Sequence, residues 1–152
     1  MMKLKLLFCS LAIIGFSVAN PAFALPNHVT ISADNITSIY DGDTFRAYLP
    51  SITSPREKST RIRIRHLDTP EIKGRCPYEK ELALHARNFG RKLLFDAHTI
   101  TLSNLAHDRY GRVLATVTLN NNISYAKQLI DAQLARPYNG GHRLGWCVNS
   151  LD

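Results

Sequence analysis

The amino-acid sequence predicts an α+β fold that is mainly β, with a small antiparallel barrel capped by helices. Two observations carry this prediction. Short segments of alternating apolar and polar residues recur through the 152-residue chain, which is typical of strands that bury one face. Two longer segments instead repeat their apolar residues at helical spacing. We therefore expect three strands, a helix, two strands and a helix, in that order.

The first three predicted strands lie in the first half of the chain. Residues 36–40 and 45–49 flank a tight turn of composition Asp-Gly-Asp-Thr. Residues 60–66 alternate arginine with isoleucine, so that the basic side chains share one face and the apolar side chains share the other. We expect residues 25–35, which are polar, to be loose at their start, and residues 50–59, which are polar and contain two prolines, to form a loop.

The first predicted helix spans residues 79–95. Its apolar side chains recur at intervals of four, three and four residues, which places them in one stripe: Leu82, Ala86, Phe89 and Leu93. Gly90 lies inside this helix and lowers its intrinsic stability without breaking it.

Two further strands and a second helix follow. Residues 98–103 and 112–119 alternate as strands on either side of a polar turn, and residues 123–134 form a helix that ends before Pro137. We expect the tail after this helix to be irregular. The oligonucleotide-binding (OB) barrel is the natural candidate for this order of elements, although the order alone leaves other α+β layouts open.

Basic residues outnumber acidic residues in this chain. The 19 Lys and Arg residues against 12 Asp and Glu residues give a formal charge of +7. A basic domain attracts nucleic acid, anionic envelope polymers or membrane surfaces. Charge alone does not separate these partners from a simple contribution to solubility.

The first 24 residues have the pattern of a secretory signal peptide. Lys3 and Lys5 precede an apolar run over residues 6–18, and small residues around Ala24 offer a cleavage site. The apolar run is short for a transmembrane helix. We therefore expect residues 25–152 to form a single exported domain, periplasmic or secreted, that keeps no membrane anchor.

The chain has three cysteines, two of which are predicted to pair. Cys9 lies in the predicted signal peptide and leaves with it. Cys76 and Cys147 are too far apart for a CxxC redox or zinc motif, and export favours a disulfide between them. Closing so long a loop stabilises a fold by about 4 kcal/mol in the chain-entropy model.

The residues with candidate catalytic chemistry concentrate around the strand predicted at 60–66. Arg61, Arg63 and Arg65 share one face of this strand, which runs into a turn with Asp68 and Glu71. Carboxylates are the ligands that hard cations such as Ca²⁺ prefer, and guanidinium groups bind phosphate oxygens through paired hydrogen bonds. The combination indicates a metal-assisted reaction on a phosphate.

Two other turns could contribute to the same site. Asp43 is the natural second metal ligand beside Asp68, because a barrel can bring their two strand ends together. Arg112 follows the turn at 108–111 and could meet the negative charge that develops when a phosphodiester is cleaved. Taken singly, each feature also has an ordinary structural explanation, since both turn sequences are common and exposed arginines are often only solvated.

Together, three sequence blocks resemble the staphylococcal nuclease (thermonuclease) family. The blocks are DGDT at 41–44, R-x-x-x-x-DTPE at 63–71 and DRYGR at 108–112, and their order and spacing match over residues 36–136. The resemblance implies a five-stranded OB-type barrel. It also implies an endonuclease that cleaves DNA and RNA with little sequence preference and leaves 3′-phosphate ends.

The resemblance further implies a calcium site. Asp43 and Asp68 would bind Ca²⁺ through their carboxylates and Thr69 through its backbone carbonyl, with Asp41 supporting them. So small a set of oxygen ligands makes a weak site, which is tolerable where calcium is roughly millimolar, outside the cytoplasm. Export and calcium dependence therefore agree with each other.

The same resemblance implies roles for the catalytic residues. Glu71 would be the general base that activates a water, and Arg63 and Arg112 would bind the scissile phosphate and stabilise the transition state. Arg109 and Tyr110 fall where the family contacts the neighbouring 3′ phosphate, although the type member has lysine at the first of these positions.

Two departures from the family concern the loop after Glu71 and the C-terminus. The loop is shorter and contains Cys76, and the chain ends shortly after Gly-Trp-Cys without the last helix of the family. We expect the disulfide to Cys147 to replace that helix and to fasten the loop to the C-terminus. Tyr138 falls near the tyrosines that flank substrate in the family, where it would stack on a base or pack internally.

The sequence therefore predicts an exported, calcium-dependent endonuclease that acts on DNA and RNA as a monomer, with no stable protein partner. The alternative is a nucleic-acid-binding module of the same fold that has lost catalysis, but every expected ligand and arginine is present. A basic envelope-binding domain would explain the charge but not the three blocks. We assign no catalytic role to the six histidines.

Overall fold

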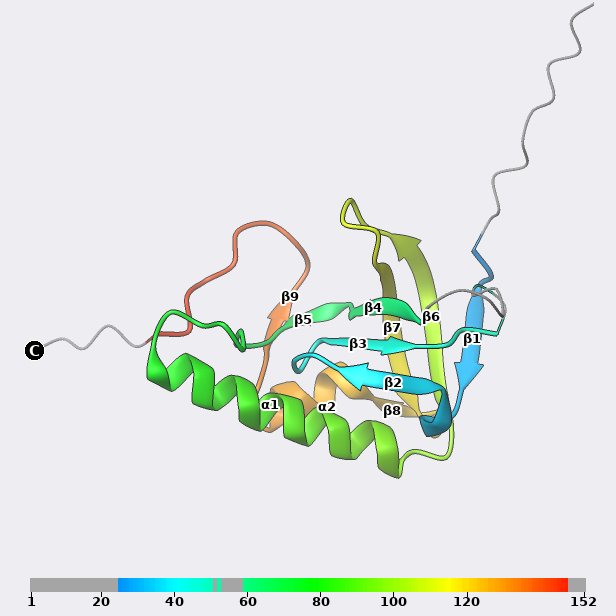
Figure 1. Cartoon of the computed structure of the whole chain (residues 1–152), viewed down its shortest axis with the longest axis horizontal. Helices are drawn as coiled ribbons and strands as arrows, with labels where there is room; N and C mark the ends of the chain where they lie inside the picture. Colours follow the sequence, from blue (N-terminus) through cyan, green and yellow to red (C-terminus); the bar gives the residue numbers. More distant parts are fainter. Residues whose placement is uncertain (1–24, 51, 53–58, 148–152) are drawn as a thin grey trace, which may run out of the picture.

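The computed structural model describes residues 25–50, 52 and 59–147, in which two α-helices pack against a curled β-sheet (Figure 1). Within these residues the sheet has seven strands in the order β1-β6-β7-β4-β3-β2, with β8 beside β7. Their bounds are His28–Ile31 (β1), Ile36–Ile39 (β2), Thr44–Ala47 (β3), Thr60–Ile64 (β4), Ile100–His107 (β6), Val113–Leu119 (β7) and Ile123–Ser124 (β8). A second, two-stranded sheet pairs β5 (His66–Asp68) with β9 (Arg136–Tyr138).

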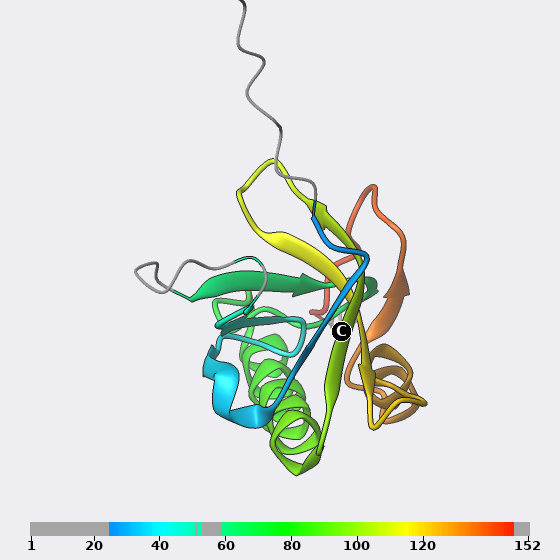
Figure 2. The same ribbon diagram turned by 90° about the vertical axis from the view of Figure 1, so that its right-hand side faces the viewer.

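The curl of the large sheet forms a half-barrel, which Figure 2 shows from the side. β4 and β7 run parallel, whereas the neighbouring strand pairs run antiparallel. The core includes these fully buried side chains: Phe45, Ile62, Ile64, Leu102 and Val117. The predicted class, a mainly β α+β fold with an OB-like barrel capped by helices, is confirmed.

β1 lies within residues 25–35, a segment for which the sequence predicted no strand. It pairs antiparallel with β6, with Val29 opposite Leu102 and Ile31 opposite Ile100. Val29 and Ile31 are both buried, so burial against a distant strand explains why this segment is ordered. A short 3-10 turn at Ala33–Asn35 then leads into β2.

The strand predicted at 60–66 divides into two strands. β4 ends at Ile64, and His66 takes a left-handed backbone conformation (φ 68°) at the start of β5. β5 pairs antiparallel with β9, so that Asp68 lies opposite Arg136. The prediction of an irregular tail is therefore wrong at β9, because three residues are too few to show an alternating pattern.

β6 and β7 form a long hairpin that projects beyond the other strands in Figure 1. β6 continues to His107, beyond the predicted end at residue 103. The pairing is irregular between Ser103 and Ala106, where Asn104 takes a left-handed conformation (φ 52°). This irregularity interrupts the alternation in sequence but not the strand. The hairpin tip carries the DRYGR block.

α1 (Pro77–Asp96) and α2 (Tyr125–Asp131) contact each other beside the sheet. α1 begins two residues before its predicted start, at a proline, which is favoured at the first helical position. α2 is shorter than the predicted helix at 123–134. Its first two predicted residues pair with β7 as β8, and Gln133 takes a left-handed conformation (φ 60°) after the helix.

Gly90 allows α1 and α2 to approach closely at Tyr125. A Cβ atom at Gly90 would lie 2.0 Å from the Tyr125 hydroxyl oxygen. That buried hydroxyl donates a 2.8 Å hydrogen bond to the carbonyl of Gly42, in the turn between β2 and β3. A glycine that is unfavourable for the helix itself thus lets a tyrosine hold the turn that carries Asp43.

Among the described residues, no helix has the length and apolar character needed to cross a bilayer. The predicted signal peptide at residues 1–24, with Cys9, lies outside the described residues.

Gly90→Ala should destabilise the protein by about 1–3 kcal/mol, because the added methyl group collides with the Tyr125 hydroxyl. At an unconstrained helical position the same change would stabilise by about 1 kcal/mol. Urea denaturation of the wild type, Gly90→Ala, Tyr125→Phe and the double variant gives the coupling free energy. Alanine at position 90 should lower the free energy of unfolding less when Tyr125 is replaced by phenylalanine. An equal loss of stability in both backgrounds would contradict this packing.

Candidate active site

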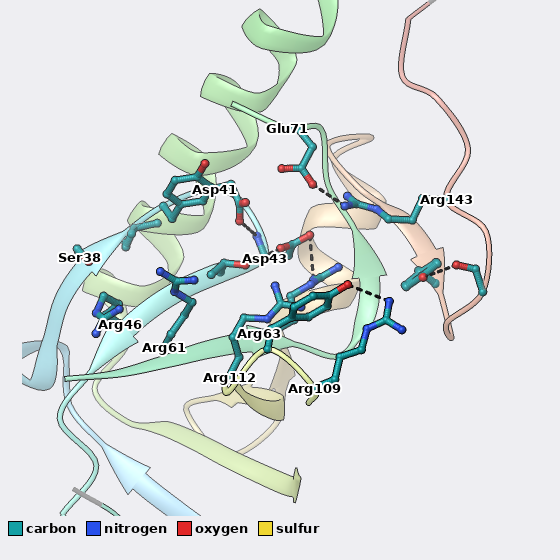
Figure 3. Close-up of a pocket in the computed structure, with 16 residues that line it drawn as sticks. Ser38, Asp41, Asp43, Arg46, Arg61, Arg63, Glu71, Arg109, Arg112 and Arg143 are labelled. Atoms are coloured by element: carbon teal, nitrogen blue, oxygen red, sulfur yellow. Dashed lines mark hydrogen bonds and ion pairs between the residues drawn. The ribbon is translucent and has the colours of Figure 1, made fainter. Parts of the chain in front are cut away.

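Segments that are far apart in the sequence meet at one cavity of about 680 Å³ (Figure 3). They are the turn after β2, the strand β4, the residues after β5, the tip of the β6–β7 hairpin, and residues 139–147, which we call the C-terminal arm. The predicted site residues that line this cavity are Asp43, Arg63, Glu71, Arg109, Tyr110, Arg112 and Tyr138. The other predicted ligands, Asp68 and Thr69, do not line it.

Asp43 is only 3% exposed and links several of these segments. Its Oδ2 accepts hydrogen bonds from the Thr69 backbone N–H and hydroxyl at 3.2 and 2.9 Å, and lies 2.9 Å from Nη1 of Arg63. Its Oδ1 accepts a 2.9 Å hydrogen bond from the Thr44 hydroxyl. Such partners are necessary, because a buried carboxylate without them is very costly.

Asp41 adds a second buried carboxylate beside Asp43. Its Oδ1 accepts a 3.0 Å hydrogen bond from the backbone N–H of Asp43. Burial, followed by repulsion from the carboxylates of Asp43 and, more weakly, Glu71, raises the pKa of Asp41 to about 8. The carboxyl groups of Asp41, Asp43 and Glu71 therefore crowd this end of the cavity, and a bound cation would relieve the repulsion between their charged forms.

Arg63 is held in one orientation by three acceptors. Besides the ion pair with Asp43, its Nη1 donates to the Ile64 carbonyl at 3.0 Å and its Nη2 donates to the Leu67 carbonyl at 3.2 Å. The side chain is almost fully buried. A guanidinium fixed in this way is preorganised to meet a phosphate in the cavity.

Asp108 positions Arg112 at the hairpin tip. Its carboxylate accepts hydrogen bonds from the backbone N–H groups of Tyr110 and Arg112 at 2.8 and 2.9 Å, and from Arg112 Nε at 2.6 Å. Burial alone would raise the pKa of Asp108, but the hydrogen bonds from Arg112 and Tyr110 hold it below its usual value. Arg112 is thus anchored through Nε, which leaves its two Nη groups for a ligand.

Arg109 and Tyr110 form the exposed edge of the same tip. Arg109 Nη2 donates a 2.8 Å hydrogen bond to the Tyr110 hydroxyl. The guanidinium carbons of Arg109 and Arg112 lie 4.9 and 5.5 Å from the centre of the Tyr110 ring. Tyr110 is 67% exposed, so its ring is accessible to a ligand in the cavity.

Asp68 is buried, does not line the cavity and contacts the C-terminal arm. Arg143 forms an ion pair with its Oδ1, Trp146 Nε1 donates to its Oδ2 at 3.1 Å, and Arg136 Nη2 lies 3.5 Å from the same oxygen. Thr69 is also buried, with its side chain bound to Asp43. The two predicted ligands that do not line the cavity are thus connected to it through residues that do, Asp68 through Arg143 and Thr69 through Asp43.

Arg143 is a site residue that the sequence prediction missed. Its guanidinium contacts the carboxylates of Asp68 and Glu71 and donates to the Thr69 carbonyl at 3.2 Å. Burial opposes its charge, but hydrogen bonds and attraction from Glu71 and Asp68 outweigh that effect and hold the pKa of Arg143 above its usual value. The only signal in the sequence was indirect, namely its position four residues before a cysteine predicted to pair.

The predicted disulfide between Cys76 and Cys147 is present, with 5.9 Å between the Cα atoms. It joins the residue before α1 to the end of the C-terminal arm. Among the described residues, α2 is the last helix. Tyr138 lines the cavity from β9, and its hydroxyl donates a 2.8 Å hydrogen bond to the Gly141 carbonyl within the arm.

The donor groups have the chemistry of a site for a hard cation. Asp43 and Asp68 offer carboxylates and Thr69 offers a carbonyl, and Asp43 binds Thr69 directly. The guanidinium of Arg143 contacts oxygens of Asp68, Glu71 and Thr69 at once, so these oxygens already converge on positive charge. Oxygen donors of this kind suit cations such as Ca²⁺ and Mg²⁺.

The OB-like fold and the arginine-lined, acidic cavity are those of a nuclease-like domain. A family model described as staphylococcal nuclease homologue matches residues 61–143, more than half of the chain. The chain therefore belongs to this family, whose members act on nucleic acid and generally depend on a metal ion. No curated protein matches the chain. The match begins after the DGDT turn. The assignment of Asp43 to the site therefore depends on the contacts described above, not on the family model.

Proposed function

We propose that the chain is an exported, calcium-dependent endonuclease that hydrolyses phosphodiester bonds of DNA and RNA and leaves 3′-phosphate ends. The observation that carries this proposal is the meeting of Glu71 with Arg63 and Arg112 at one cavity, next to the buried carboxylate of Asp43. A carboxylate that accepts a proton and guanidinium groups that bind phosphate oxygens are what phosphodiester hydrolysis requires.

Arg63 and Arg112 bind the non-bridging oxygens of the scissile phosphate in this proposal. Their fixed charges meet the negative charge that builds up on these oxygens as water adds to phosphorus. Glu71 accepts a proton of the attacking water as the water oxygen bonds to phosphorus, the bond from phosphorus to the 5′-oxygen breaks, and the 5′-oxygen leaves as a hydroxyl after taking a proton from solvent. The phosphate therefore remains on the 3′ side of the cut.

The edge of the cavity would hold the rest of the substrate strand. Arg109 and Tyr110 lie next to Arg112, where they can contact the neighbouring 3′ phosphate. Tyr138 lines the cavity and flanks the strand there. Contacts to phosphates carry no sequence information, so the proposed enzyme has little sequence preference.

Asp43, Asp68 and the Thr69 carbonyl would hold the Ca²⁺ ion, which supplies positive charge that polarises the phosphate and activates water. A site with few protein ligands is weak, and calcium outside the cytoplasm is roughly millimolar. The signal peptide predicted at residues 1–24 supports export to the periplasm or the medium. We propose a monomer that keeps no membrane anchor.

An inactive nucleic-acid-binding module of the same fold is the alternative. Loss of catalysis would leave the fold and the basic surface but remove ligands or phosphate-binding arginines. Asp43, Arg63, Glu71 and Arg112 are all present and grouped at one site, which favours the enzyme.

Arg112→Ala should lower turnover by about 10²–10³-fold and change DNA affinity far less, because this guanidinium stabilises the negative charge that develops in the transition state. Glu71→Gln should have the same pattern. Arg63→Ala is less informative, because it leaves the buried Asp43 carboxylate without its cation and destabilises the fold. Arg91→Ala, an exposed change on α1 outside the cavity, is the matched control for lost charge.

Cleavage of single-stranded and duplex DNA and of RNA is measured with millimolar calcium and with EGTA, and binding is measured in EGTA. Cleavage that EGTA abolishes is the expected result. Binding without calcium-stimulated cleavage would identify the inactive module instead. Equal losses of affinity and turnover in Arg112→Ala would contradict the role assigned to this arginine.

A further inference from the structure

The C-terminal arm brings a fixed cation to the oxygens that are proposed to bind calcium. After β9 the chain turns back through the two glycines at 140–141, which take left-handed conformations (φ 100° and 89°). Figure 3 shows Arg143, which follows this turn, pointing at Glu71. The same guanidinium contacts the Asp68 carboxylate and the Thr69 carbonyl.

The arm is anchored at both of its ends. At its start β9 pairs with β5, and at its end Cys147 is bonded to Cys76. Between these points the guanidinium of Arg136 lies 3.6 Å from the centre of the Trp146 ring and donates hydrogen bonds to two arm carbonyls at 2.9 and 3.2 Å. These contacts hold the backbone on both sides of Arg143 close to Asp68.

We propose that Arg143 competes with the divalent cation for the oxygens of Asp68 and Thr69 and thereby sets the cation affinity of the site. This inference rests on the function proposed above. A guanidinium and a divalent cation repel each other, so they cannot both contact the same carboxylate oxygen closely. Binding of the cation therefore requires Arg143 to withdraw. The free energy lost with the contacts of Arg143 weakens the net binding of the cation.

The two anchors strengthen this competition. A group held on a short tether has a high effective concentration at its binding site, so Arg143 returns whenever the oxygens are free. Its withdrawal also breaks the ion pair with Glu71. Arrival of the cation would thus free the Glu71 carboxylate to accept a proton, which couples cation binding to the proposed base.

Direct measurement of calcium binding tests the competition. Isothermal titration of Arg143→Ala with calcium chloride should give a dissociation constant at least about fivefold tighter than that of the wild type. Arg143→Lys keeps the charge without the planar fork and should lie between them. Lys73→Ala removes an exposed cation from the loop after Glu71 and should bind calcium as the wild type does.

A second variant changes the tether instead of the arginine. Replacing both Cys76 and Cys147 with serine keeps Arg143 but frees the end of the arm, so calcium should again bind more tightly. Circular dichroism confirms that each variant is folded. Calcium should also raise the melting temperature of Arg143→Ala more than that of the wild type.

Arg143→Ala that binds calcium no more tightly than the wild type would overturn the competition. A Lys73→Ala variant that shows the same gain would also overturn it, because general charge would then explain the effect. If neither the wild type nor any variant binds calcium, the calcium assignment in the proposed function fails first.

A different observation assigns a second site at the other end of the cavity. Arg46 on β3 and Arg61 on β4 are direct cross-strand partners, and both line the cavity. Figure 3 shows this pair near Ser38, away from Glu71 and Arg143. Like charges placed directly opposite each other destabilise a sheet, so the position favours a bound anion.

The two arginines of the pair differ in their contacts. Arg46 donates hydrogen bonds to the carbonyl and hydroxyl of Ser59 at 2.7 and 3.3 Å, which fix its guanidinium. The Arg61 side chain is exposed and makes no hydrogen bond or ion pair with the rest of the described chain, although the Arg61 backbone pairs with β3. Tyr40 also lines this end of the cavity and is 50% exposed.

The pair also connects the cavity to a neighbouring hollow. This hollow has a volume of about 480 Å³ and shares Arg46, Arg61, Tyr110 and Arg112 with the cavity. Positive charge thus continues from the proposed catalytic arginines to the pair without an intervening acidic side chain among the residues that line the hollow.

We infer that the Arg46–Arg61 pair binds a backbone phosphate of the substrate strand beyond the scissile phosphate, with Tyr40 available to stack on a base. This inference also rests on the proposed function. It implies that a longer strand gains contacts that a short one cannot reach. The gain should be electrostatic and therefore sensitive to salt.

Fluorescence anisotropy in EGTA compares a labelled dinucleotide with a single-stranded dodecanucleotide. Arg61→Ala should weaken binding of the longer strand several-fold and leave the dinucleotide unchanged. For the longer strand, the slope of log affinity against log salt should fall in magnitude by about 0.7, the value of one phosphate contact on a single strand. Arg91→Ala, outside the cavity, is the matched control.

Equal losses for both lengths, or no loss for either, would overturn this second site. So would an equal loss in Arg91→Ala, since net charge alone would then account for it. A wild type that binds neither oligonucleotide would instead contradict the proposed function.

Discussion

The buried carboxylate of Asp43 is the group on which the candidate site depends. One of its oxygens joins Arg63 on β4 to Thr69 after β5, and the other holds Thr44 at the start of β3. Removing any of these partners would leave a buried charge poorly satisfied, so the segments are fixed relative to one another. Tyr125 adds a further restraint by holding the carbonyl of Gly42. A single cluster of ionic and hydrogen bonds therefore sets the geometry of the cavity.

The distribution of charge around this cluster explains the position of the C-terminal arm. Asp68 and Glu71 add negative charge beside Asp43, and Arg143 from the arm contacts both of them. The disulfide to Cys76 keeps that arm against the loop before α1. The cavity is consequently acidic at one end and basic at the other. A nuclease that depends on a metal ion needs both kinds of charge, since it must hold the ion and a polyanionic strand together.

Much of the site was predictable because each sequence block places its own residues at the end of a strand or in a turn. Arg63, Glu71 and Arg112 needed only the barrel to bring their segments together. The strands β1 and β9 were missed, because segments of three or four residues are ordered by distant partners and leave little pattern of their own. The contacts of Asp68 with Arg143 depend on a disulfide and a glycine turn, so they belong to the tertiary structure alone.

Crystal structures of residues 25–152 grown with calcium and with EGTA would show most directly whether the same oxygens bind Arg143 in the absence of calcium and the calcium ion in its presence. With calcium, we expect an ion bound by Asp43, Asp68 and the Thr69 carbonyl, and the guanidinium of Arg143 removed from Asp68. With EGTA, the guanidinium should contact Asp68 and Glu71. An ion bound elsewhere, or an Arg143 that stays on Asp68 beside the bound ion, would contradict this account.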